Sequence, residues 1–198
     1  MGAGSLDDNA KSRFAGQRVS VVVGGAEHRP QNRDRFDRVV SGLVLNFLDD
    51  PRQAVGEMRA SARPGGVVAG YVWEYGGRME FLRVLWDEAV ALDPAARTLD
   101  EGARFPICER TALESVWRDA GTRDVRSDAI EIPTRFETFS DYWQPFLAGT
   151  GPAPAYAMSL SEGKRSELRG RVEHRLVAGP EGTIDLVARA WAVRGTVP

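Results

Sequence analysis

Two apolar segments of this 198-residue chain lead into residues that could take part in chemistry. Residues 36–42 (FDRVVSG) end in Ser41 and Gly42, and residues 67–73 (VVAGYVW) run directly into Glu74. A carboxylate just past a buried strand could accept a proton from a substrate, and an exposed surface acid is the alternative interpretation. Ser41 and Gly42 either line a bound ligand or end their strand in a small-residue turn.

Aromatic residues gather near the same segments and further along the chain. Trp73 and Tyr75 flank Glu74, and Tyr142 and Trp143 lie in the aromatic-rich stretch FETFSDYWQPFLAG. Aromatic side chains at helical or strand spacing pack in hydrophobic cores or line pockets, and the spacing alone leaves both roles open.

Several other kinds of chemistry find no support in the sequence. We expect His28, in a polar loop, and His174, on a basic helix, to be solvated. No Asp, Glu and His set has metal-ligand spacing, so no metal is predicted. Cys108 is the only cysteine and has no partner close in sequence, and no G-x-S-x-G motif is present, so acyl transfer and a disulfide framework are not indicated.

Composition also limits the class of partner. The formal net charge is −2, and the basic run over residues 164–175 is typical of a solvated helix face, so no nucleic-acid partner is predicted. The first residues lack the apolar stretch of a signal peptide, and no apolar run approaches membrane-spanning length. We therefore expect a cytoplasmic protein with no membrane association.

The chemically interesting residues follow the two strands of a predicted βαβ unit. Both strands are almost entirely apolar, which is typical of strands buried on two faces. Between them, Asp50 and Pro51 give a helix start, with Asp at the N-cap and Pro at the first helical position. Residues 63–66 (RPGG) are predicted to end that helix. Two parallel strands joined by a helix predict an α/β sheet.

The remaining elements extend this sheet. Strands are predicted over residues 19–23 and 125–133, and a last strand over residues 184–193 follows long connections, which suits an antiparallel insertion. Helices are predicted around residues 81–89, from a capping box at residues 111–114, over residues 136–149 and after a second capping box at residues 159–162, with loops over residues 93–106 and 150–157.

The segment RPGGVVAGYVW, following a helix, resembles the fifth-strand region of class I S-adenosylmethionine-dependent methyltransferases. Upstream, FDRVVSGLVLNFLDDP resembles the fourth strand of that family and the entry to its next helix, and VSVVVGGAEHRP resembles the third strand with its loop. The tail GTIDLVARAWAVRG resembles the closing strand of small-molecule members. The resemblance implies an incomplete Rossmann-like methyltransferase sheet, mostly parallel with an antiparallel last strand and with helices on both faces.

The resemblance also implies a function, a cofactor and a set of site residues. It implies methyl transfer from S-adenosylmethionine, bound across the carboxyl ends of the strands. Members that methylate amide or exocyclic amino nitrogens often carry Asn-Pro-Pro-Tyr after the fourth strand. This chain has Ser41-Gly42-Leu43-Val44 there, which favours a small-molecule acceptor over DNA or glutamine. By position, the cofactor residues are Gly25, Ala26, Glu27, Ser41, Gly42, Leu43 and Asn46, and the substrate residues are Trp73, Glu74, Tyr75, Tyr142 and Trp143, the last two in a lid. Many members carry an acidic residue at the position of Gly25, and Glu27 is otherwise a solvated loop acid.

The family's first strand and the Gly-rich loop after it cannot be recognised in this sequence. Without them the strand over residues 36–42 becomes a sheet edge, which leaves three alternatives open. The chain is a truncated product, the strand over residues 19–23 pairs directly with this edge, or a homo-oligomer or a complementing chain completes the sheet there. We expect an irregular segment over residues 1–18 and one truncated methyltransferase-like domain over residues 19–198, with residues 134–180 as a lid or insert. A non-catalytic relic or partner subunit with this fold is the alternative to an enzyme.

Overall fold

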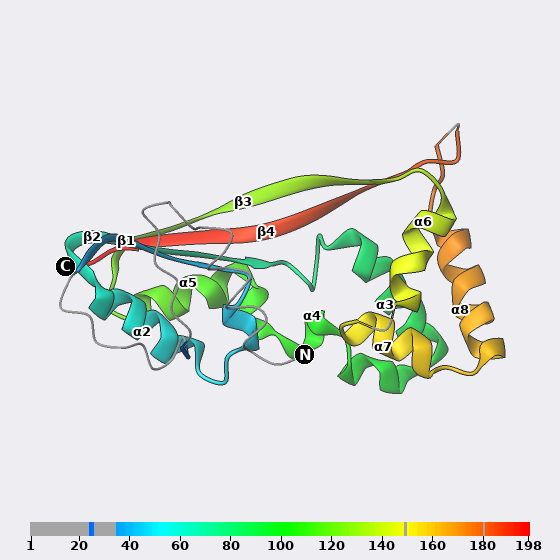
Figure 1. Ribbon diagram of the computed structural model, residues 1–198, viewed down its shortest axis with the longest axis horizontal. Coiled ribbons are helices and arrows are strands. Elements are labelled where there is room, and N and C mark those ends of the chain that lie inside the picture. The colour runs from blue at the N-terminus through cyan, green and yellow to red at the C-terminus, as the bar shows by residue number, and fades with distance from the viewer. Residues whose placement is uncertain (1–23, 26–34, 149, 180) are drawn as a thin grey trace, which may run out of the picture.

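The computed structural model describes residues 24–25, 35–148, 150–179 and 181–198. Four strands form one mixed sheet in the order β1-β2-β4-β3: β1 (Phe36–Gly42), β2 (Ala62–Trp73), β3 (Arg123–Phe136) and β4 (Ile184–Thr196) (Figure 1). β1 runs parallel to β2, whereas β4 is antiparallel to both β2 and β3. The predicted α/β class and the antiparallel insertion of the last strand are confirmed. The predicted strand over residues 19–23 lies outside the described residues.

The βαβ unit forms as its sequence indicates. The intervening helix α2 (Pro51–Ser61) is capped by the Asp50 carboxylate, which accepts a hydrogen bond from the Gln53 N–H at 2.9 Å. The helix ends at Ser61, before the predicted stop, and the RPGG segment belongs to β2, where Gly65 has a φ of +73°.

The other helices differ from prediction at several places. Residues 93–106, predicted as a loop, contain η2 (Pro94–Thr98) and α4 (Glu101–Arg104). α5 (Arg110–Asp119) begins before Thr111 and has no side-chain cap, because Glu114 instead accepts hydrogen bonds from Ser127 and Arg118. Residues 150–157, predicted as a loop, contain most of α7 (Pro152–Ser159). Ser161, rather than Ser159, caps the next helix. The remaining helices are η1 (Leu45–Phe47), α3 (Glu80–Leu92), η3 (Pro106–Cys108), α6 (Phe139–Trp143), η4 (Gln144–Leu147) and α8 (Glu162–Arg175).

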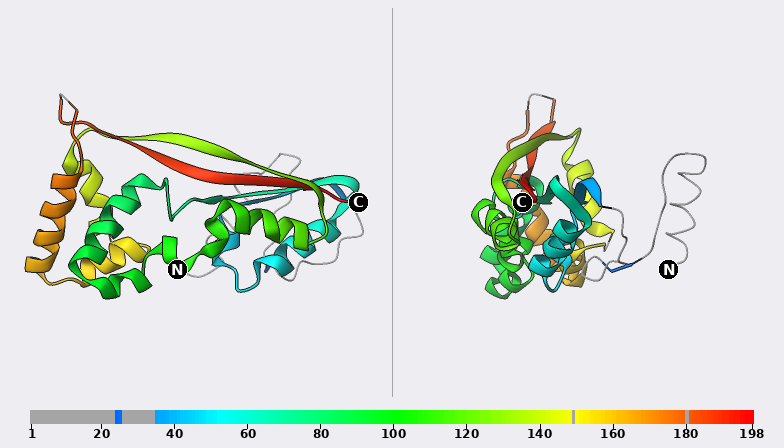
Figure 2. Two further views of the ribbon diagram at one scale, coloured as in Figure 1. Left: turned by 180° about the vertical axis from the view of Figure 1, so that it is seen from behind. Right: turned by 90° about the vertical axis from the view of Figure 1, so that its left-hand side faces the viewer.

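The molecule is elongated, with its helices in two groups beneath a long β3–β4 ribbon (Figures 1 and 2). α2 and α5 pack on the sheet at the β1 end, and α3, α6, α7 and α8 pack under the other end of the ribbon. Two hydrophobic clusters result. The sheet cluster contains Val39, Val55, Val68, Leu113, Trp117 and Val193, and the helical cluster contains Leu85, Trp86, Tyr142, Phe146, Leu168 and Ile184.

β4 contributes to both clusters through opposite faces. Ile184, Ala188 and Ala190 are buried toward the helical cluster, whereas Val193 and Gly195 are buried on the alternate face. Successive side chains of a strand point to opposite faces, and strands twist along their length, so one ribbon can cover two cores on opposite sides. The two groups of helices therefore pack on alternate faces of β4.

The second face of the sheet at the β1 end is accessible as far as the described residues extend. Val40 of β1 is 65% exposed and Tyr71 of β2 is 37% exposed, although both strands are otherwise apolar. Within the described residues β1 pairs with β2 alone, so its other edge is free. No helix in this part of the chain is both long and apolar enough to cross a bilayer.

Candidate functional site

The carboxyl ends of β1 and β2 lie side by side and bring the first predicted residues together. Gly42 pairs with Tyr71 at the last step of the β1–β2 ladder, and Ser41 pairs with Gly70. In open α/β sheets ligands bind outside the carboxyl ends of the strands. The structure therefore places Ser41, Gly42 and Leu43 at the edge where a ligand would bind.

Leu43 leaves β1 in an unusual backbone conformation. Its φ is +57°, and its N–H donates a hydrogen bond to the Tyr71 carbonyl oxygen at 2.9 Å. A left-handed conformation costs a non-glycine residue about 1–2 kcal/mol. Such residues cluster at functional sites, where the surrounding structure holds them in place. The sharp turn at Leu43 leads the chain directly into η1.

Asn46, on η1, has a buried amide without a hydrogen-bond partner. The residue is 7% exposed, and its Nδ2 has no acceptor among the described residues. A buried amide group without a partner costs free energy, and native proteins avoid it unless a ligand or water completes the bond. Asn46 therefore presents a donor that a bound molecule could satisfy, four residues after the end of β1.

An aromatic wall continues from η1 to the loop before η3. The ring of Phe47, which is 60% exposed, meets Phe105 edge-on at 5.4 Å between centroids, and Phe105 lies 5.8 Å from the ring of Tyr75. The Arg104 guanidinium lies 5.5 Å from the Phe105 ring centroid. Sequence reasoning did not select Phe105, because it lies in a segment predicted as a loop and far along the chain from η1.

Burial raises the pKa values of three titratable groups near this wall, Tyr75, Cys108 and Glu101. Burial, with the nearby Cys108 and Glu101, raises the pKa of Tyr75 to about 12. Burial, with Glu109 nearby, also raises the pKa of the Cys108 thiol to about 12. Burial raises the pKa of Glu101, whose carboxylate accepts a hydrogen bond from the Trp86 indole N–H. At neutral pH Tyr75 is therefore a hydrogen-bond donor, and Cys108 is a thiol rather than a nucleophilic thiolate.

Glu74 is engaged in an ion-pair network. Its carboxylate lies 3.4 Å from the Arg189 guanidinium, which also pairs with Glu131 and lies over the Trp191 ring. The neighbouring Trp73 is half-buried and packs against the helical cluster. The ion pair with Arg189 orients the Glu74 carboxylate, which favours a positioning role over that of a free proton acceptor.

Tyr142 and Trp143 lie inside the helical cluster rather than beside Gly42. They are 1% and 4% exposed, and the Tyr142 hydroxyl donates to the Phe81 carbonyl oxygen at 2.6 Å. Burial raises the pKa of Tyr142, so this hydroxyl stays protonated. Trp73 and Tyr75 pack against the same cluster, so the four predicted aromatic substrate residues share one hydrophobic environment.

The remaining predicted cofactor residues belong to the loop after residues 19–23. Gly25 is described and exposed, whereas Ala26 and Glu27 lie outside the described residues. Across residues 24–25, 35–148, 150–179 and 181–198, no group of three His, Cys, Asp or Glu side chains could hold a metal ion.

Comparison with known proteins connects this site to a family. The family described as "Methyltransferase domain" matches residues 4–70, which include β1, η1, α2 and most of β2. A demethylmenaquinone methyltransferase of Roseiflexus castenholzii is 34% identical over 57% of this chain and 52% of its own length. The chain spans about half the length of the curated relatives it matches.

Solved structures agree on the fold. A candidate methyltransferase of Bacillus halodurans superposes with a TM-score of 0.58 at 14% identity, over 98% of this chain and 79% of that one. A candidate methyltransferase from a complex with the Haloferax volcanii Trm112 methyltransferase activator gives 0.51 at 19% identity, over 100% of this chain and 70% of that one. Together, the matched family and the curated relative show that this chain is similar in sequence to methyltransferases, and the solved structures show that it has their Rossmann-like fold.

Proposed function

We propose that this chain transfers the methyl group of S-adenosylmethionine to a small-molecule acceptor at the carboxyl ends of β1 and β2. The observation that carries the proposal is the buried, unpartnered Nδ2 of Asn46 beside the left-handed Leu43. The cofactor offers carboxylate and hydroxyl oxygens, which are the acceptors this amide lacks. The donor set at this edge therefore fits the group that the family uses.

The cofactor would lie against residues from β1 and η1. Ser41, Gly42 and Leu43 would line it and Asn46 would donate to it, with Gly25, Ala26 and Glu27 completing the adenine side. Gly42 is exposed at the strand end, and the Tyr71 hydroxyl would lie 2.6 Å from a Cβ placed there, so a larger residue would clash with the Tyr71 ring. S-adenosylmethionine supplies an activated methyl group on a sulfonium, and the protein's task is to align it with the acceptor.

The chain's own residues would bind and shield the acceptor. Phe47, Phe105 and Tyr75 would form an apolar wall that excludes water, and the protonated Tyr75 hydroxyl could orient an acceptor by hydrogen bonding. Trp73 and Glu74 would hold the end of β2 in place, and the helices carrying Tyr142 and Trp143 would support the pocket as a lid. The replacement of Asn-Pro-Pro-Tyr by Ser41-Gly42-Leu43-Val44 supports a small molecule over a nucleic-acid base.

Titration with S-adenosylhomocysteine by calorimetry tests the cofactor site. A saturable isotherm with a micromolar dissociation constant, lost in Asn46→Leu, would support the proposal. A screen of small O, N and C acceptors with labelled cofactor would then identify the acceptor class. A well-folded sample that does not bind S-adenosylhomocysteine would overturn the enzyme proposal for this chain and favour a non-catalytic partner subunit.

One edge of β1 has no partner strand among the described residues, which leads us to propose that a second copy of the chain pairs along it. If two β1 strands pair antiparallel with Val39 opposite Val39, Asp37 faces Ser41 and Arg38 faces Val40, so no like charges are opposed. Isologous twofold pairing is the commonest form of homo-oligomer. Light scattering over a concentration series should detect a dimer that Val40→Lys dissociates, because a lysine on an exposed edge strand disfavours pairing. A monomer at every concentration, or a dimer that Val40→Lys leaves intact, would contradict the pairing.

A further inference from the structure

Two arginines face each other across the β3–β4 ladder, and no described residue supplies a counter-ion to either. Arg126 of β3 is the register partner of Arg194 of β4, and both side chains are exposed. Residues directly opposite on antiparallel strands have Cβ atoms about 4.5–5.5 Å apart, and like charges in that position destabilise the sheet. Neither guanidinium pairs with a carboxylate of the described residues, although Arg189 and Arg135, on the same two strands, both do.

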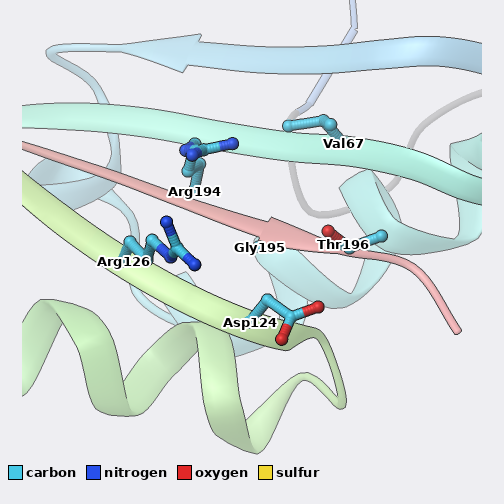
Figure 3. Close-up of a pocket in the computed structure, with 6 residues that line it drawn as sticks. All are labelled: Val67, Asp124, Arg126, Arg194, Gly195 and Thr196. Atoms are coloured by element: carbon cyan, nitrogen blue, oxygen red, sulfur yellow. The ribbon is translucent and has the colours of Figure 1, made fainter.

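The arginine pair lines a small recess on the accessible face of the sheet. The recess has a volume of about 230 Å³, and Figure 3 shows both arginine side chains rising from neighbouring strands on the same side. Its lining residues are Val67, Asp124, Arg126, Arg194, Gly195 and Thr196. Since pockets for drug-sized ligands measure about 300–1,000 Å³, this recess suits a single charged group rather than a whole cofactor.

The backbone of β3 is specially shaped beside the pair. The strand register shifts between Arg123 and Arg126, and Asp124, within that irregularity, has a φ of +53°. Bulges of this kind re-aim neighbouring side chains. The Asp124 carboxylate points away from the two guanidiniums in Figure 3, so it does not neutralise them.

We infer that the recess is a second binding site, which holds a phosphate group between Arg126 and Arg194. Guanidinium groups bind phosphate through paired, charge-assisted hydrogen bonds, and an anion between two arginines removes their mutual repulsion. The recess is distinct from the candidate cofactor site. Arg194 pairs with Ala69 of β2, and Ala69 pairs with Val40 of β1, so the arginine pair lies on the strands beyond β2 and before the strand ends at Gly42 and Trp73.

Titration of the ¹⁵N-labelled chain with inorganic phosphate, at constant ionic strength set by chloride, tests the site. We expect saturable shifts of the Arg126, Arg194 and Thr196 amides, with a dissociation constant in the millimolar range. Arg126→Gln and Arg194→Gln should each weaken binding at least tenfold. The matched control is Arg97→Gln, which removes the same charge from an exposed arginine that has no ion pair among the described residues.

One further measurement distinguishes a phosphomonoester from free phosphate, and a second measures how the arginine pair affects the stability of the protein. Methyl phosphate binding as tightly as inorganic phosphate would indicate a phosphomonoester ligand, and weaker binding would indicate the free ion. Arg126→Gln should also raise the urea midpoint in phosphate-free buffer, because it removes the like-charge pair.

The inference would be overturned by shifts that do not saturate, by equal effects of chloride, or by Arg97→Gln weakening binding as much as Arg126→Gln. S-adenosylhomocysteine affinity should stay unchanged in Arg126→Gln, so the phosphate site and the cofactor site fail or succeed independently.

Discussion

Asn46→Leu should stabilise the protein while it weakens cofactor binding, a combination that few substitutions produce. Asn46 is 7% exposed, and its Nδ2 has no acceptor among the described residues. An unsatisfied buried polar group costs about 1–3 kcal/mol, and replacement by an apolar side chain of similar volume removes that cost. We therefore expect the free energy of unfolding, measured without cofactor, to rise by about 1 kcal/mol.

The same substitution removes the donor proposed to bind the cofactor. A hydrogen bond to a charged group contributes about 1.5–3 kcal/mol, which corresponds to roughly a 10- to 100-fold loss of affinity for S-adenosylhomocysteine. Urea denaturation followed by tryptophan fluorescence gives the first quantity, since the chain has five tryptophans, and calorimetry gives the second.

The matched control is Tyr156→Phe. Tyr156 also carries a buried hydroxyl without a partner among the described residues, but it lies in the helical cluster. Its substitution should raise stability in the same direction and leave the affinity unchanged. If Asn46→Leu destabilises the protein and binds S-adenosylhomocysteine normally, the reasoning from the unpartnered amide is refuted.

Three further substitutions test the packing and electrostatics around the site. Burial raises the pKa of Glu101 above its ordinary value of 4.5, so the folded state binds more protons than the unfolded chain and stability falls as pH rises from about that value. Glu101→Gln keeps an acceptor for the Trp86 N–H and should remove this loss of stability. The urea midpoint of the variant should therefore rise relative to that of the wild type between pH 4 and pH 8. A difference in midpoint that does not change with pH would contradict this. Gly70→Ala should cost about 1–3 kcal/mol in chemical denaturation, because the added Cβ would lie 2.8 Å from the Trp117 ring; a neutral result would mean the ring can move aside. Asp50→Ala should cost about 1 kcal/mol by loss of the α2 cap, measured by urea unfolding against Asp50→Asn, which retains a capping oxygen.

The local elements of the βαβ unit could be predicted because their signals are contained in short segments. β1 begins at Phe36 and ends at Gly42 as its apolar run indicates, and α2 starts after Asp50 with Pro51 in the first turn. A strand with an apolar face and a helix with a side-chain cap need little information from distant residues.

Tertiary contacts decided the elements that were predicted incorrectly. Glu114 fits the last position of a capping box, but Ser127, from β3, donates to its carboxylate and the helix starts earlier. The Pro- and Ala-rich segment of α7 looks like a loop, yet it packs Ala153 and Ala157 into the helical cluster with no exposure at all. Such burial overrides weak local propensity.

Only part of the candidate site could be predicted from the sequence, because tertiary contacts determine the rest. Asn46 follows a strand in the sequence, so its position could be predicted, but its missing hydrogen-bond partner is a property of the packed structure. Phe105 joins Phe47 and Tyr75 only because the chain returns past the end of β2. Tyr142 was predicted for a lid, and its spacing could not reveal that its hydroxyl is bound to the Phe81 carbonyl.

The change of buried face along β4 restricts how this protein can vary. Inserting one residue between Ala190 and Val193 would move every later side chain of β4 to the opposite face of the strand. One of the two hydrophobic clusters would then lose the β4 side chains that pack against it. The helices between β3 and β4 can therefore be exchanged for other helical segments only if both strands keep their residue count. A change of acceptor specificity through these helices should thus proceed by replacement between Phe136 and Ile184, while the lengths of the two strands remain fixed.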